Sequence, residues 1–337
     1  MKKVMIVDDS AFMRKVVTDL LNQLPDIEVT VAARNGKQAL DYLTKEAIDL
    51  VVMDVEMPVM NGLETLRRMK QQSAIPVIML SSLTNQETTI EALALGARDF
   101  VEKPVSLSMI EKEWIAEFHQ KILAMDHEVG TVHPPVPTIA QPTKLTQNSL
   151  PVSLDALVIG ASTGGPRALL GIIRRLPARL RCPILIVQHM PAGFTASFAK
   201  RFLDTETTVR VQEAVDGMRI ENQVYLCPGD YHMTVQQGHL QLDQREKRHG
   251  TRPTVDYLFS SAADYYGPQL AAVVLTGMGK DGTAGLRQIQ AAGGYTIVQD
   301  KETCTVFGMP RYAIEQGVVD EVLPLQGIEA KIAQMVR

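Results

Sequence analysis

Short apolar runs alternate with segments of helical periodicity throughout residues 1–123. Four of the five runs have the length of a buried strand, the last is shorter, and each ends in polar loop residues. Strands that are apolar on both faces must be covered on both faces, as in parallel sheets whose strands are joined by helices. The pattern predicts an α/β domain with a five-stranded parallel sheet, built on Val4–Val7, Val29–Ala32, Leu50–Met53, Val77–Leu80 and Phe100–Val101.

The second half of the chain, from about Leu154, is also of α/β type. A hairpin over residues 233–242 turns at Gln237-Gly238, and it interrupts a series of single strands and helices. We therefore predict a mostly parallel sheet with a β-hairpin insertion. The predicted strands are Ala156–Ile159, Ile184–Val187, Val224–Leu226, Ala271–Leu275 and Tyr295–Val298, and the predicted helices are Arg167–Leu176, Thr254–Tyr266, Asp281–Ala291 and Ile328–Val336.

Between the two halves lies a stretch rich in proline, threonine, glutamine, serine and asparagine. Its prolines favour extended backbone, so we expect a semi-rigid linker rather than a packed element. The predicted division is a first domain at 1–123, a linker at 124–152 and a second domain at 153–337. The prolines of the linker are Pro134, Pro135, Pro137, Pro142 and Pro151.

Composition limits the classes of partner and setting. The 337 residues suit two domains of about 150 residues each, and the net charge of −4 argues against nucleic acid as a partner. Cys182, Cys227 and Cys304 are too scattered for a disulfide framework or a zinc site. Asp8 and Asp9 interrupt the apolar start that a signal peptide would need, and no run reaches the ~18 apolar residues of a membrane helix. We expect a cytoplasmic monomer without membrane insertion.

Three carboxylates follow predicted strands of the first domain: Asp8 and Asp9 after the first strand, and Asp54 after the third. With the strand order 2-1-3-4-5 these two strands are neighbours where the order reverses, which is where such sheets bind ligands. The carboxylates would repel one another, and Mg²⁺ suits a sparse site of this kind. Lys103 and Ser81 follow two further strands. Each aspartate alone could be a helix N-cap, but together these residues predict phosphoryl transfer to Asp54.

Four segments add a family resemblance: VDDS at 7–10, MDVEMPVMNG at 53–62, PVIMLSS at 76–82 and EKP at 102–104. Residues 1–120 resemble a receiver domain of two-component systems, which implies a doubly wound, flavodoxin-like fold. The resemblance implies a histidine kinase as phosphodonor and Asp54 as phospho-acceptor. It also implies a set of Mg²⁺ ligands and switch residues. The ligands are Asp9, Asp54 and the backbone carbonyl of Glu56, supported by Asp8, and the switch residues are Ser81, Phe100 and Lys103.

In the second domain, residues 160–164 read Gly-Ala-Ser-Thr-Gly directly after an apolar strand. This is the G-x-S-x-G pattern in its required strand–turn–helix context, and it predicts Ser162 as an exposed nucleophile. Pro166 opens the following helix, whose free N–H groups can stabilise an oxyanion. The alternative is a glycine-rich turn that binds phosphate, as in nucleotide-binding folds. The second strand argues against it, because that strand ends in Gln188-His189 without an acid for ribose.

Two further residues follow strands at the same expected sheet edge. His189 comes directly after the second strand and can act as general base. Asp281 lies in a glycine-rich loop after the strand Ala271–Leu275 and can orient the imidazole. Asp281 is also placed to cap the next helix. The order serine, histidine, aspartate differs from that of α/β-hydrolases, but a triad is defined by geometry rather than by order.

Five segments of the second domain carry another resemblance: IGASTGGP at 159–166, QHMP at 188–191, RPTVD at 252–256, LTGMGKDG at 275–282 and FGMPR at 307–311. They resemble the catalytic domain of chemotaxis protein-glutamate methylesterases. The resemblance implies that such an enzyme also deamidates glutamines, acts on methyl-accepting chemoreceptors and needs no cofactor for ester hydrolysis. It implies nucleophile, base and orienting acid at Ser162, His189 and Asp281, with Thr163 and the backbone around Met278 as oxyanion and histidine support.

Two other functions compete with a hydrolase. One is a receiver domain attached to a nucleotide-binding module, and the other is a non-enzymatic adaptor or transcription regulator. The missing ribose-binding acid disfavours the first. The second is disfavoured because the sequence has no helix-turn-helix signal and no basic C-terminal domain.

Overall fold

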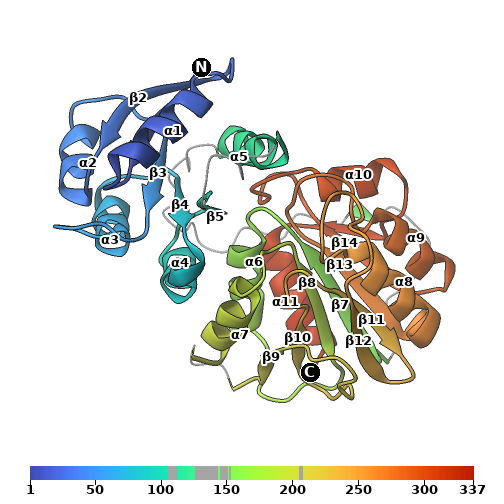
Figure 1. The fold of residues 1–337 in the computed structure, drawn as a ribbon. Helices are drawn as coiled ribbons and strands as arrows, with labels where there is room; N and C mark the ends of the chain where they lie inside the picture. Colours follow the sequence, from blue (N-terminus) through green and yellow to red (C-terminus); the bar gives the residue numbers. More distant parts are fainter. Residues whose placement is uncertain (105–111, 126–142, 145–150, 152, 205–207) are drawn as a thin grey trace. The chain divides into compact units, whose positions relative to one another are not determined.

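The computed structural model describes residues 1–104, 112–125, 143–144, 151, 153–204 and 208–337 (Figure 1). The chain divides into two compact units, residues 1–135 and 136–337. Most of the predicted linker at 124–152 lies outside the described residues. Within it, Thr143–Lys144 form the short strand β6, which belongs to the sheet of the second unit.

The first unit has a five-stranded sheet in the order β2-β1-β3-β4-β5, with all neighbours parallel. This confirms the predicted doubly wound topology. Side-chain oxygens of Ser10, Asn35 and Asn61 accept N–H bonds from the first turns of α1, α2 and α3, so the helices start where the strand-end loops supply caps. The strands are β1 (Lys2–Val7), β2 (Ile27–Ala33), β3 (Leu50–Asp54), β4 (Val77–Ser81) and β5 (Asp99–Glu102), and the helices are α1 (Ala11–Leu21), α2 (Gly36–Leu43), α3 (Gly62–Gln72), α4 (Gln86–Ala94) and α5 (Lys112–Ala124).

The second unit has an eight-stranded sheet in the order β6-β15-β14-β13-β7-β8-β10-β9. Only the β15–β6 pair is antiparallel. The predicted hairpin forms a separate ribbon, with Gln237 and Gly238 both at positive φ in its turn. The strands are β7 (Ala156–Ala161), β8 (Ile184–Gln188), β9 (Val211–Glu213), β10 (Val224–Leu226), β11 (His232–Gln236), β12 (His239–Asp243), β13 (Leu270–Val274), β14 (Tyr295–Gln299) and β15 (Glu321–Leu323).

Helices cover both faces of this sheet. In Figure 1, α6, α7 and α11 lie on one face and α8, α9 and α10 on the other. The sequence prediction lacked α7, α10 and the strands β9 and β15. For α10, β9 and β15 the reason is length, because three-residue strands and a seven-residue helix are too short to display a period. The helices are α6 (Gly165–Arg174), α7 (Phe194–Asp204), α8 (Val255–Tyr266), α9 (Thr283–Ala291), α10 (Met309–Glu315) and α11 (Leu325–Met335).

Strand β7 lies where the strand order of the second unit reverses. Its neighbours are β8 on one side and β13 on the other, so the loops that follow these three strands meet at one sheet edge. Gly160 brings α8 close to this edge, since a Cβ there would lie 2.4 Å from a methyl carbon of Val255. Among the described residues, none of the helices combines the length and the apolar character needed to cross a membrane.

Candidate active site

The predicted acidic residues of the first unit meet at the carboxyl ends of β1 and β3. Carboxylate oxygens of Asp8, Asp9 and Asp54 lie within 4.8 Å of one another. The Lys103 ammonium is 2.8 Å from Asp8 Oδ2 and 2.7 Å from Asp54 Oδ2. Asp9, Asp54 and Lys103 line a cavity of about 420 Å³, to which Glu56 also contributes. The strand order therefore brings together residues that are up to 95 positions apart, from Asp8 to Lys103.

The electrostatics of this cluster suit a hard divalent cation. Burial raises the pKa of Asp54 to about 6, the Asp8 charge adds to that shift, and the bonds to Lys103 and the Glu56 N–H offset part of it. Two buried carboxylates share a single ammonium, so the cluster retains negative charge for a cation to neutralise. An all-oxygen donor set that includes the exposed Asp9 fits Mg²⁺, which keeps several of its waters.

Of the three predicted switch residues, Lys103 is bonded to Asp54, and the other two, Ser81 and Phe100, lie on β4 and β5. Ser81 ends β4 and is buried, and its hydroxyl is bonded to Thr89 Oγ1 and to the Ser82 carbonyl. Phe100 lies in β5 and is also buried, with the Lys121 ammonium 5.6 Å from its ring centroid. Both side chains thus point into packed surroundings in this structure.

In the second unit, Ser162 directly follows β7 in a tight turn. Its N–H donates to the Thr276 carbonyl at 3.1 Å, which ties the turn to the loop after β13. Gly164 has φ +78°, a conformation that glycine adopts at little cost, and it begins α6. Gly277 allows the close approach of the two loops, because a Cβ there would lie 2.7 Å from Ser162 Cβ. The serine is therefore held by backbone contacts on both sides.

The three predicted catalytic side chains form a connected row. His189 Nδ1 lies 3.2 Å from Ser162 Oγ, and His189 Nε2 lies 2.8 Å from Asp281 Oδ2. The His189 and Asp281 side chains are 12% and 3% exposed. A carboxylate only accepts, so Nε2 carries the proton toward Asp281 and leaves the Nδ1 lone pair free to accept from the serine hydroxyl. This is the tautomer that a general base requires.

Asp281 does not cap the helix that follows it, contrary to the role considered from the sequence. The N-cap residue of α9 is Gly282, which offers no side chain. The Asp281 carboxylate instead accepts the N–H groups of Val255 at 2.7 Å and Asp256 at 3.1 Å, at the start of α8, and that of Gly282 at 2.9 Å. Burial alone would raise the pKa of Asp281, but the bonds to His189, Val255 and Asp256 outweigh it and lower the pKa.

The main-chain N–H groups of Thr163, which follows Ser162, and of Met278, which follows Gly277, lack a protein acceptor among the described residues. The Thr163 carbonyl accepts from the Thr276 hydroxyl at 3.0 Å, and the Gly277 carbonyl accepts from Met309 N–H at 2.8 Å. The bond to Gly277 fixes the peptide that carries the Met278 N–H, and the bond to Thr163 fixes the peptide that follows Thr163. Thr163 and Met278 are the residues that the sequence analysis associated with an oxyanion.

Gln188 is a site residue that the sequence analysis did not single out. It ends β8, is 1% exposed, and its Nε2 donates to the carbonyls of Ser162 at 2.9 Å and His189 at 3.0 Å. It therefore bridges the backbones of Ser162 and His189. A polar residue at the end of an apolar strand is the signal that could have identified it. Cys304 could be considered as an alternative nucleophile, but burial and the nearby Asp300 raise the pKa of its thiol and disfavour that role.

Comparisons with known proteins assign each of the two units to a family. Residues 157–332 match the family model of the CheB methylesterase, and residues 4–114 match that of the response regulator receiver domain. A protein-glutamate methylesterase/protein-glutamine glutaminase of Pyrococcus abyssi is 43% identical, with 99% of this chain and 93% of the relative covered. The Thermotoga maritima relative of the same name is 42% identical, with 99% and 98% covered.

A solved structure supports the fold of the second unit. The CheB methylesterase catalytic domain of Thermotoga maritima aligns with a TM-score of 0.52 and 46% identity, over 55% of this chain and all of that domain. A nucleotide-binding module and a non-enzymatic adaptor are thereby excluded as descriptions of the second unit. The chain belongs to the CheB family of chemotaxis enzymes, which are protein-glutamate methylesterases and protein-glutamine glutaminases with a response regulator receiver domain.

Proposed function

We propose that this enzyme hydrolyses glutamate methyl esters on chemoreceptors through a triad of Ser162, His189 and Asp281. His189 Nδ1 accepts the hydroxyl proton while Ser162 Oγ attacks the γ-carbonyl carbon of the ester. The Nε2–H bond to Asp281 keeps the ring in place and stabilises the imidazolium that forms. The Thr163 and Met278 N–H groups are the candidate donors to the negatively charged oxygen of the tetrahedral intermediate.

The reaction is completed in two steps. His189 first returns its proton to the methoxy oxygen as the C–O bond breaks, so that methanol departs and Ser162 remains acylated. Water attacks this acyl group and gives a proton to His189, which passes it to Ser162 Oγ as the glutamate carboxylate is released. Glutamine deamidation follows the same course with ammonia as the leaving group.

The first unit supplies the control in this proposal. Asp54 accepts a phosphoryl group from a histidine kinase, and Lys103 helps to balance the charge in the cluster. Asp9, Asp54 and the Glu56 carbonyl are the residues that would hold Mg²⁺, with Asp8 in support. The ion would neutralise negative charge on the phosphoryl oxygens. We place the enzyme in the cytoplasm as a monomer that acts on the cytoplasmic helices of its receptors.

The single observation that carries the hydrolase proposal is the continuous row Ser162–His189–Asp281, at 3.2 Å and 2.8 Å, at the reversal point of the sheet. The test is to mix the full-length chain with methylated chemoreceptor and to measure the methanol released. We expect methanol from methylated receptor and ammonia from receptor glutamines. An absence of both products with an intact, folded receptor would contradict the proposal.

Phosphorylation of Asp54 should raise the methylesterase rate. We expect a phosphodonor to increase methanol release several-fold with the natural chain, and to leave the rate of Asp54→Asn unchanged, because an amide cannot accept the phosphoryl group. The measurement is methanol release with and without the cognate kinase and ATP. An equal response from Asp54→Asn would show that activation does not pass through Asp54.

A shortened chain tests how the receiver acts. We propose that the unmodified receiver restricts access to Ser162, so a chain that begins near Leu150 should be faster than the unphosphorylated full-length chain. The separate Thermotoga maritima catalytic domain indicates that this unit can be studied alone. Equal rates for the two chains would exclude the model in which the unmodified receiver restricts access to Ser162. They would favour a model in which the phosphorylated receiver itself increases the rate of the catalytic unit.

A further inference from the structure

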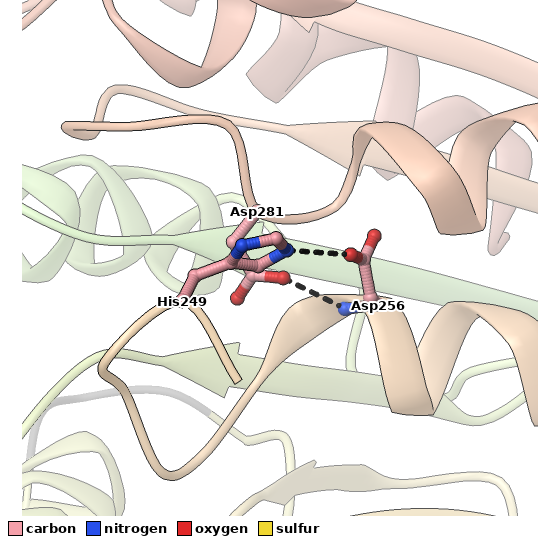
Figure 2. A group of neighbouring side chains, drawn as sticks. All are labelled: His249, Asp256 and Asp281. Atoms are coloured by element: carbon pink, nitrogen blue, oxygen red, sulfur yellow. Dashed lines mark hydrogen bonds and ion pairs between the residues drawn. The ribbon is translucent and has the colours of Figure 1, made fainter. Parts of the chain in front are cut away.

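Beside the triad, Asp281 has two further polar neighbours, Asp256 and His249, which come from the start of α8 and from the loop before it (Figure 2). Asp256 is 1% exposed. Its Oδ2 lies 3.2 Å from His249 Nε2 and 3.4 Å from a guanidinium nitrogen of Arg248. The proposed mechanism uses neither Asp256 nor His249.

His249, Asp256 and Asp281 together have the composition of a metal site, but the lone pairs of Asp281 already accept hydrogen bonds. Asp281 Oδ2 accepts from His189 and Val255, and Asp281 Oδ1 accepts from Asp256 and Gly282. A carboxylate oxygen has two lone pairs in the carboxyl plane, so Asp281 has no further capacity in this arrangement. The cluster is therefore explained by hydrogen bonds within the protein.

The two aspartates exchange caps between neighbouring helices. Neither Thr254, which precedes α8, nor Gly282, which precedes α9, makes a side-chain capping bond. Asp281, from the loop before α9, accepts the first N–H groups of α8, and Asp256 Oδ1, from α8, accepts the N–H of Gly285 in α9 at 2.9 Å. Each helix start thus depends on a carboxylate from the other.

The exchange matters for His189 because it joins Asp281 to a rigid unit. The helices are in direct contact at Gly285, where a Cβ would lie 2.3 Å from Phe259 Cβ. Asp281 is two residues before α9, so a shift of the first turn of α9 would move its carboxylate relative to His189 Nε2. A displacement of about 1 Å in such a group can cost about 100-fold in rate.

We propose that Asp256 is a positioning residue for the methylesterase reaction, which holds Asp281 against His189 by fixing the first turn of α9. Arg248 and His249 bond to its other oxygen and orient the carboxylate toward Gly285. This inference rests on the proposed triad. It assigns to Asp256 no contact with the substrate, so its loss should affect kcat rather than KM.

Three substitutions in the full-length chain test this role. Asp256→Ala removes the acceptor for Gly285, and we expect kcat to fall about 10- to 100-fold while KM changes less than about twofold. Asp256→Asn keeps an oxygen for Gly285, and kcat should return to within about threefold of the natural value. Asp256→Glu keeps the charge but moves it by one methylene, so it should resemble Asp256→Ala.

The matched control is Asp320→Ala, which removes another fully buried aspartate that accepts a main-chain N–H, that of Thr296. Thr296 lies near the amino end of β14, at the edge of the sheet opposite Ser162. Thermal unfolding compares the stability loss of the two alanine variants. Asp320→Ala should be destabilised in the same way and should keep the natural kcat in the folded fraction.

Fluorophosphonate labelling provides a readout that does not depend on the receptor. We expect the labelling rate of Ser162 to fall with kcat in Asp256→Ala and to recover in Asp256→Asn. The positioning role would be overturned, and the triad left in place, if folded Asp256→Ala were labelled as fast as the natural chain. The same conclusion would follow if the alanine and asparagine variants lost labelling rate equally. A natural chain that is not labelled at Ser162 would overturn the triad and this inference together.

Discussion

Replacing Ser162 with alanine should lower the rate of methyl-ester hydrolysis by about 10⁴-fold or more, because the variant has no group that can form the acyl intermediate. The change removes a hydroxyl and leaves the backbone bonds of the turn in place. We therefore expect a folded protein with a natural unfolding temperature. The measurement is methanol release from methylated receptor, together with fluorophosphonate labelling of the natural and variant chains.

Cys304→Ser is the matched control for this experiment. Cys304 is the thiol that could be proposed as a rival nucleophile, and its raised pKa keeps it protonated. We expect Cys304→Ser to keep the natural rate and the natural labelling. If Ser162→Ala retained full activity, Ser162 would not be the nucleophile. If Cys304→Ser lost activity, the reaction would depend on the Cys304 thiol.

Replacing Asp281 with asparagine should lower kcat by about 10³- to 10⁴-fold. The carboxylate accepts four N–H groups, two on each oxygen, and an amide has a single oxygen. If the amide oxygen faces Asp256 and Gly282, the amide NH₂ faces His189 Nε2 and favours the tautomer in which Nδ1 carries the proton. That tautomer cannot accept the proton of Ser162. The measurement is kcat over a range of pH.

The same substitution should also reduce stability. Whichever way the amide faces, at least one buried main-chain N–H loses its acceptor, that of Val255 in one orientation and those of Asp256 and Gly282 in the other, and each such loss costs about 1–3 kcal/mol. Because the pKa of Asp281 is lowered in the folded state, its stabilising effect is present above the unfolded pKa and is lost as the pH falls through the folded pKa. The stability gap between the natural chain and Asp281→Asn should therefore narrow in acid. A gap that does not change with pH would contradict a charged Asp281.

Much of the site could be predicted because parallel strands direct their carboxyl ends to one edge of a sheet. Ser162, His189 and Asp281 each follow a predicted strand, and so do Asp8 and Asp54. The strand pattern therefore predicted which residues would gather, although they are far apart along the chain. The G-x-S-x-G pattern further selected Ser162, since it marks a turn of a defined shape.

What the sequence determined by itself is the identity of most of the elements and the type of residue at the end of each predicted strand, because these depend on local periodicity and on turn chemistry. Only the tertiary structure decided that Nδ1 rather than Nε2 of His189 faces Ser162, that Gln188 bridges two backbones, and that Asp281 caps α8 while Asp256 caps α9. Each of these depends on a contact between segments distant in sequence, and on which of several donors lies within about 3 Å of an acceptor once the helices are packed. Local patterns carry no record of such distances.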